Sequence, residues 1–113
     1  MARRELELTH YEADWVLMPA AGGKIVEAVR ITIFGPNFPQ RAVEPEILVG
    51  KTVAHNVSIT RDQRSIRGYF NELPPDGGLV RVRYGDSQEG VLRAPFSRRN
   101  VRPLPKECEP PWR

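Results

Sequence analysis

Apolar and polar residues alternate along much of this chain, and the alternation predicts a series of short strands. Every second side chain is apolar between residues 29 and 34, and again between residues 79 and 84. A period of two places successive side chains on opposite faces of a strand, so each segment should turn one face to a core and one to water. The side chains expected to face the core are Val29, Ile31, Ile33, Val80, Val82 and Tyr84.

Weaker versions of the same pattern predict five further strands. They cover residues 4–10, 46–50, 52–60, 65–70 and 90–96. In the first of these, one side is expected to carry Leu6, Leu8 and His10. In the 52–60 segment, one face is expected to carry Val53, His55, Val57 and Ile59, opposite Ala54, Asn56 and Ser58. Val101 and Leu104 are expected to add a last contact at a sheet edge.

Glycine, proline and polar residues mark the turns between these segments. The predicted turns and loops are residues 20–23, 35–39, 61–64, 73–78 and 85–90. Proline cannot donate a hydrogen bond to a strand ladder, and glycine permits a sharp bend, so both residues end a strand. Residues 15–18 are a compact apolar patch that ends at Pro19, and residues 24–28 lead into the strand that follows.

These elements predict an all-β fold. About seven short strands with turn signals every 8–12 residues are typical of an immunoglobulin-like β-sandwich, and no segment shows a helical period. A chain of 113 residues is long enough for one domain that buries about 65% of its unfolded surface. We predict a single domain over residues 1–104 and a proline-rich tail over residues 105–113. The alternative fold is a small SH3-like barrel.

Charge adds one candidate binding surface. The net charge is +3, and 14 of the 17 basic residues are arginine, interspersed with 14 acidic residues. Several arginines fall on outward strand positions or just beyond them: Arg81, Arg83, Arg93, Arg98, Arg99 and Arg102. If the 79–84 and 90–96 strands pair, the first three form a basic stripe suited to nucleic acid or an acidic protein. The other interpretation is a solvated face whose charges discourage aggregation between sheet edges.

The sequence carries no constellation typical of catalysis or metal binding. A hydrolase triad drawn from Ser58, His55 and Asp62 fails if the first two, three apart on a strand, point to opposite faces. The two histidines are 45 positions apart and the one cysteine lies near the C-terminus, a spacing that does not make a metal site. No glycine-rich phosphate loop joins a strand to a helix. We predict that the protein is not an enzyme and needs no cofactor or metal.

The remaining sequence features concern location and the C-terminal tail. Cys108 has no second cysteine to pair with, which suits a reducing compartment. The N-terminal arginines precede no apolar run, and no stretch approaches the ~20 apolar residues that cross a bilayer. We therefore expect a cytoplasmic protein without membrane contact. Trp112, beside two prolines, is either an anchor for a partner or part of an inactive end.

One segment resembles a known family. Residues 31–38 read ITIFGPNF and resemble the strand-and-turn motif of the IPT/TIG domains, an immunoglobulin-like (E-set) family. The family pattern begins with a Gly-Gly turn, for which residues 19–23 are the counterpart. It continues with a strand ending in glycine, a Pro-Pro…Gly turn with a valine strand, and a closing strand. The strand ending in glycine resembles residues 47–50, and the turn with its valine strand resembles residues 74–82. The closing strand resembles residues 90–96.

The resemblance covers residues 15–104 and implies a binding or spacer module. Such domains occur in transcription factors of the Rel type, in cell-surface receptors and in carbohydrate-active enzymes as accessory domains. Residues 24–28 depart from the pattern as an insertion between the Gly-Gly turn and the threonine-containing strand. Fold alone does not choose among these functions.

We predict a non-catalytic protein-interaction or assembly module. The expected partner is a protein, including another copy of the same chain bound through an exposed sheet edge or face. No small-molecule substrate is expected. The alternative is a nucleic-acid-binding domain that uses the arginine-rich sheet face, and it predicts an affinity that falls steeply with salt.

Overall fold

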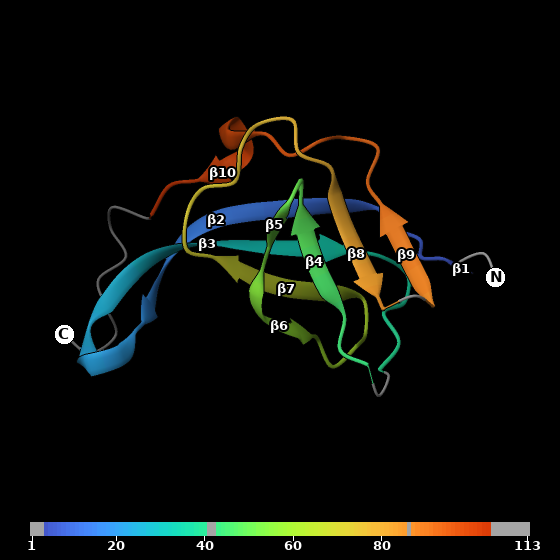
Figure 1. Ribbon diagram of the computed structural model, residues 1–113, viewed down its shortest axis with the longest axis horizontal. Helices are drawn as coiled ribbons and strands as arrows, with labels where there is room; N and C mark the ends of the chain where they lie inside the picture. The colour runs from blue at the N-terminus through green and yellow to red at the C-terminus, as the bar shows by residue number, and fades with distance from the viewer. Residues whose placement is uncertain (1–3, 41–42, 86, 105–113) are drawn as a thin grey trace.

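The computed structural model describes residues 4–40, 43–85 and 87–104, which form two five-stranded β-sheets packed against each other (Figure 1). This part of the chain contains no α-helix. Its helical turns are two three-residue 3-10 turns, η1 (Ala21–Gly23) and η2 (Arg98–Asn100). The predicted all-β sandwich is confirmed, and seven of its strands are four residues or longer.

The first sheet, called sheet A, has the strand order β1-β9-β8-β4-β5. Its strands in chain order are β1 (Arg4–Glu5), β4 (Glu46–Val49), β5 (Thr52–Val53), β8 (Val80–Tyr84) and β9 (Gln88–Val91). Neighbouring strands are antiparallel except for β1 and β9, which are parallel. The predicted pairing of the 79–84 segment with the following strand is confirmed.

The second sheet, called sheet B, has the strand order β10-β2-β3-β7-β6. Its strands are β2 (His10–Pro19), β3 (Ile25–Phe34), β6 (His55–Ile59), β7 (Ser65–Phe70) and β10 (Val101–Arg102). Neighbouring strands are antiparallel except for β10 and β2. No described strand of sheet B pairs with one of sheet A, so the two sheets do not close into the alternative SH3-like barrel.

The core between the sheets follows the predicted alternation. The six side chains predicted to face inward are at most 1% exposed: Val29, Ile31, Ile33, Val80, Val82 and Tyr84. Ile47 and Val49 of β4 are fully buried, as are Ile66 of β7 and Phe38 in the loop after β3. Each such side chain contributes about 1.5–3 kcal/mol when it leaves water, so this alternation is what holds the sheets together.

The predicted single strand over residues 52–60 is wrong. β5 pairs with β4 in sheet A, whereas β6 pairs with β7 in sheet B, so the chain changes sheets at Ala54. Ala54 is buried (8% exposed), whereas Val53 is 52% exposed, the reverse of the expected faces. A register shift follows within β6, where Asn56 has a φ of 53°.

Two other strand predictions need correction at their ends. The expected 4–10 strand is only two residues long, and His10 instead begins β2. Leu6 is buried without belonging to a strand. The expected 90–96 strand begins at Gln88 and ends at Val91, and the chain beyond it buries Phe96 from a loop.

Candidate interaction surfaces

The hairpin of β2 and β3 extends beyond the rest of sheet B. The two strands pair over all ten residues of each, to Pro19 opposite Ile25. β7 pairs with β3 only from Val29 onward, and β10 pairs with β2 only at Ala13 and Asp14. In residues 16–27, here called the arm, the two strands pair with each other, and no further described strand pairs with the outer edge of either one. The arm projects at the lower left of Figure 1, in line with the long axis of 52 Å against 30 and 24 Å across.

The turn at the tip of the arm is the one that the sequence predicts over residues 20–23. Gly22 and Gly23 have φ values of 77° and 75°, in the left-handed region where glycine has no steric penalty. The Ala20 N–H donates to the Lys24 carbonyl across the turn, at 2.7 Å. The glycines thus reverse the chain and set the strand register of the arm.

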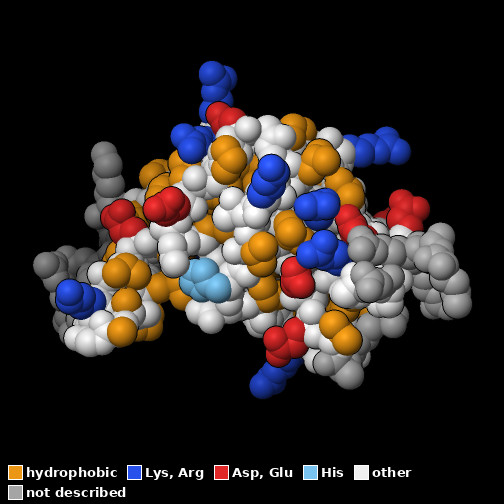
Figure 2. Space-filling view, viewed as in Figure 1, with side chains coloured by type: hydrophobic (Ala, Val, Ile, Leu, Met, Phe, Trp, Pro, Cys, Tyr) orange, Lys and Arg blue, Asp and Glu red, His pale blue; other side chains and the backbone are white. Residues whose placement is uncertain are grey.

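The arm is apolar on both faces. Cross-strand partners share a face, so Pro19 and Ile25 lie on one side, with Leu17, and Met18 and Val26 lie on the other. Leu17, Ile25 and Val26 are 47%, 51% and 42% exposed. Figure 2 shows apolar side chains gathered over the arm at the lower left of the view. A surface of this kind marks an interaction site more often than a stable solvent-facing element.

The arginine stripe expected on sheet A is interrupted by carboxylates. The Arg83 Nη2 donates to Glu46 Oε2 at 3.0 Å, from the neighbouring strand β4. The Arg81 Nη1 lies 3.6 Å from Glu89 Oε1 on β9. Arg93 is exposed just after β9, outside the ladder. The outer face of β8 therefore carries alternating charges rather than a continuous basic stripe.

The remaining candidate arginines lie elsewhere. In η2, Arg98 is tied to the predicted 73–78 turn, since its Nε donates to the Pro74 carbonyl at 3.1 Å. Arg99 is also in η2 and is exposed. Arg102 is on β10 in sheet B. Trp112 lies outside the described residues.

The three residues of the rejected triad are not bonded to one another. The prediction that His55 and Ser58 point to opposite faces is wrong: the register shift places them opposite Tyr69 and Arg67, which share the outer face of β7. The His55 Nε2 instead pairs with the Asn71 Oδ1 at 2.9 Å.

Asp62 is occupied within its own turn. Its Oδ1 accepts from the Thr60 hydroxyl at 2.7 Å and from the Arg64 backbone N–H at 3.1 Å. These hydrogen bonds, the Thr60 hydroxyl first, lower the pKa of the Asp62 carboxyl. The carboxylate therefore stabilises the predicted 61–64 turn.

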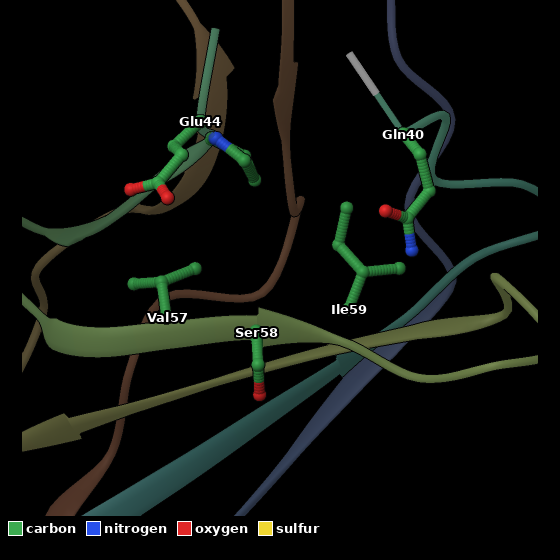
Figure 3. Close-up of a pocket in the computed structure, with 6 residues that line it drawn as sticks. Gln40, Glu44, Val57, Ser58 and Ile59 are labelled. Carbon is green, nitrogen blue, oxygen red and sulfur yellow. The ribbon is translucent and has the colours of Figure 1, made fainter. Parts of the chain in front are cut away.

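A hollow of about 340 Å³ lies beside β6. Figure 3 shows Val57 and Ile59 pointing to the side of β6 on which Gln40 and Glu44 lie, while Ser58 points to the opposite side. The described lining therefore presents one carboxylate and one amide next to the apolar edge of the core. That set can accept or donate a hydrogen bond, but it pairs no acid with a base.

The outer face of sheet B carries a charged cluster that the sequence analysis missed. Asp14 on β2 lies opposite Arg30 on β3. The Arg30 Nε and Nη2 donate to the two carboxylate oxygens of Asp14 at 3.0 and 2.6 Å. This bidentate bond raises the pKa of Arg30 above its usual value. The sequence signal was the two carboxylates at the alternate positions 12 and 14 and the arginine at position 30, but the pairing of β2 with β3 was not predicted.

The described residues form neither a metal-ion cluster nor a membrane-spanning helix. No group of three or more His, Cys, Asp or Glu residues in the described ranges is arranged to hold a metal ion. None of the described elements is a helix long and apolar enough to cross a membrane. Comparison of the chain with protein-family models, curated proteins and solved structures finds no match.

Proposed function

We propose that this chain is a non-catalytic assembly module that binds a second copy of itself through the arm. The observation that carries the proposal is the exposure of Leu17, Ile25 and Val26 on a hairpin that leaves the sandwich. Apolar side chains on both faces of a two-stranded ribbon stay in contact with water, and they stabilise the structure only when another surface covers them. A paired hairpin alone is marginally stable in water, which adds to the advantage of a partner.

Charge supports a second copy as the partner. Within the arm, Lys24 and Glu27 are the charged residues, one of each sign. In a two-fold symmetric interface each patch meets itself, so residue i contacts residue j and the reverse. A patch with one cation and one anion satisfies this requirement without like-charge repulsion. The nucleic-acid alternative has less support, because Arg81 and Arg83 already pair with carboxylates.

Light scattering on the purified protein over a range of concentrations tests the proposal. The expected result is a rise in mass from one copy to two as concentration increases. Val26→Glu should hold the protein at one copy, because a carboxylate would be buried among apolar side chains. The matched control is Val91→Glu, at a 47% exposed strand position of sheet A, which should dimerise like the parent. A single-copy mass for the parent at every concentration would refute self-association.

The proposal also includes the family of the sandwich and the location of the protein. The sandwich is proposed to be of the IPT/TIG kind, supported by residues 31–38, which form the end of β3 and the turn after it. The residue directly after β4 is Gly50, whose φ is 61°, in keeping with the glycine that ends this strand in the family pattern. The proposed location is the cytoplasm, supported by the single cysteine.

A further inference from the structure

The outer face of sheet B holds a hollow of about 140 Å³ that is lined by residues of β2, β3, β7 and β10, among them Asp14 and Arg30. Its charged and polar lining residues are Glu12, Asp14, Arg30, Thr32, Arg67 and Arg102. Strand register explains why they meet: Thr32 lies opposite both Glu12 and Arg67, and Asp14 lies opposite both Arg30 and Arg102. Residues from four strands, β2, β3, β7 and β10, thus form one site, here called the Arg67 hollow.

The charges in the hollow leave one cation without a counterion. Arg30 is bound to Asp14 through two hydrogen bonds, and the Arg102 Nη2 lies 3.9 Å from Glu12 Oε1. Arg67 makes no ion pair with any described residue. Its Nε is buried and has no hydrogen-bond partner there. A buried donor without an acceptor is unfavourable, and the penalty is larger for a charged group.

The lining selects the class of anion. Three arginines and two carboxylates leave a net charge of about +1, which one monoanion neutralises. Glu12 and Asp14 would repel a dianion such as a phosphate monoester. The planar guanidinium matches the two oxygens of a carboxylate. Thr32, only 8% exposed, places a hydroxyl donor on the neighbouring strand.

We propose that the Arg67 hollow binds a single carboxylate group of a protein, from an Asp or Glu side chain or from a chain end. Binding brings the carboxylate oxygens to the Arg67 guanidinium while Arg30 and Arg102 keep their own partners. The site lies on the body of sheet B and does not depend on the arm.

Nuclear magnetic resonance of the arginine Nε–H groups tests this inference. The probe is sodium acetate, compared with sodium chloride at equal ionic strength. The Arg67 Nε–H signal should shift with acetate and saturate, with half-saturation at roughly 10–100 mM, the range expected for one charge-assisted contact. The Arg30 Nε–H, already bonded to Asp14, should move much less.

Variants and other probes make the result decisive. Arg67→Gln should abolish the acetate-dependent shifts of backbone amides around Thr32, and Arg67→Lys should weaken them. Arg61→Gln, in an exposed turn, changes the net charge equally and should leave them unchanged. N-acetyl-glutamate α-amide and N-acetyl-alanine present a side-chain and a chain-end carboxylate, and the tighter of the two identifies the source.

Three outcomes would overturn the inference. In the first, acetate shifts the Arg67 Nε–H signal no more than the Arg61 Nε–H signal. In the second, chloride shifts the Arg67 signal as much as acetate does. In the third, inorganic phosphate half-saturates the shift at a lower concentration than acetate. The last would assign the hollow to phosphate groups. Dimerisation through the arm is measured separately by light scattering, so failure of either proposal leaves the other standing.

Discussion

At the scale of single residues, Gly90 shows how closely the chain segments pack. It lies on β9 opposite Val82, and a Cβ atom there would collide with the Leu6 carbonyl oxygen and stand 2.9 Å from the Leu8 Cγ. Backbone cannot move aside as a side-chain end can. The absence of a side chain at Gly90 thus lets residues 6–8 cross the strand and bury Leu6 in the core.

We predict that Gly90→Ala destabilises the protein by about 2 kcal/mol, the usual effect of forcing one methyl group into a packed site. Chemical denaturation followed by circular dichroism measures the loss. Val91→Ala, on the exposed side of the same strand, serves as the control and should change stability by less than about 1 kcal/mol. Equal effects of the two variants would show that the close approach of Leu6 is not what requires glycine. The sequence placed Gly90 where the 85–90 loop meets the 90–96 strand and gave no sign of the close contact with Leu6, because the crossing segment lies more than 80 positions away.

Asp62 provides a pH-dependent prediction at the same scale. Its pKa is lowered in the folded protein by the Thr60 hydroxyl and the Arg64 N–H. A lowered folded pKa contributes stability above the unfolded value, about 3.9, and this stability is lost as pH falls through the folded pKa. Asp62→Asn should therefore have a lower melting temperature than the parent at pH 7, with the gap closing below about pH 4. If the difference in melting temperature stays constant with pH, the change in the shape of the side chain, and not the loss of the Asp62 charge, causes it.

At the scale of elements, the passage from β5 to β6 is where sequence reasoning failed. Val53, His55, Val57 and Ile59 alternate without interruption, and the pattern gives no sign that two sheets share them. The chain changes sheets at Ala54, whose small side chain is buried at the crossing, and the register shift after it turns Ser58 to the same face as His55. β3 and β8 were predictable because each stays in one sheet with one face buried.

The left-handed conformation of Asn56 is central to this change of register. A non-glycine residue at a φ of 53° is disfavoured by about 1–2 kcal/mol, and asparagine tolerates it better than most. Asn56→Gly should leave the free energy of unfolding within about 0.5 kcal/mol of the parent, whereas Asn56→Val should lower it by about 2 kcal/mol. Urea denaturation of the two variants measures the difference. Valine and glycine variants of equal stability would contradict a strained bulge.

At the scale of the whole molecule, the arm is the feature that the sequence conceals. Residues 15–18 form an apolar patch that looks like core, and residues 25–26 continue it on the other strand. Periodicity reports which side chains avoid water but not which surface covers them. The neighbouring strands end near Ala13 and Val29, and only this long-range pairing leaves the apolar arm outside the sandwich.

This arrangement predicts two levels of stability within one pair of strands. Backbone amides of residues 29–34 lie between β2 and β7, so their hydrogen exchange requires opening of the sandwich. Amides of residues 25–28 belong to a two-stranded ribbon and should exchange many times faster in dilute protein.

Because a second copy would cover the arm, raising the concentration should slow exchange in 16–19 and 25–28 and leave 29–34 unchanged. Val26→Glu should remove that concentration dependence. Exchange in the arm that ignores concentration would contradict the proposed assembly, and exchange as slow as in 29–34 at high dilution would contradict an unsupported ribbon.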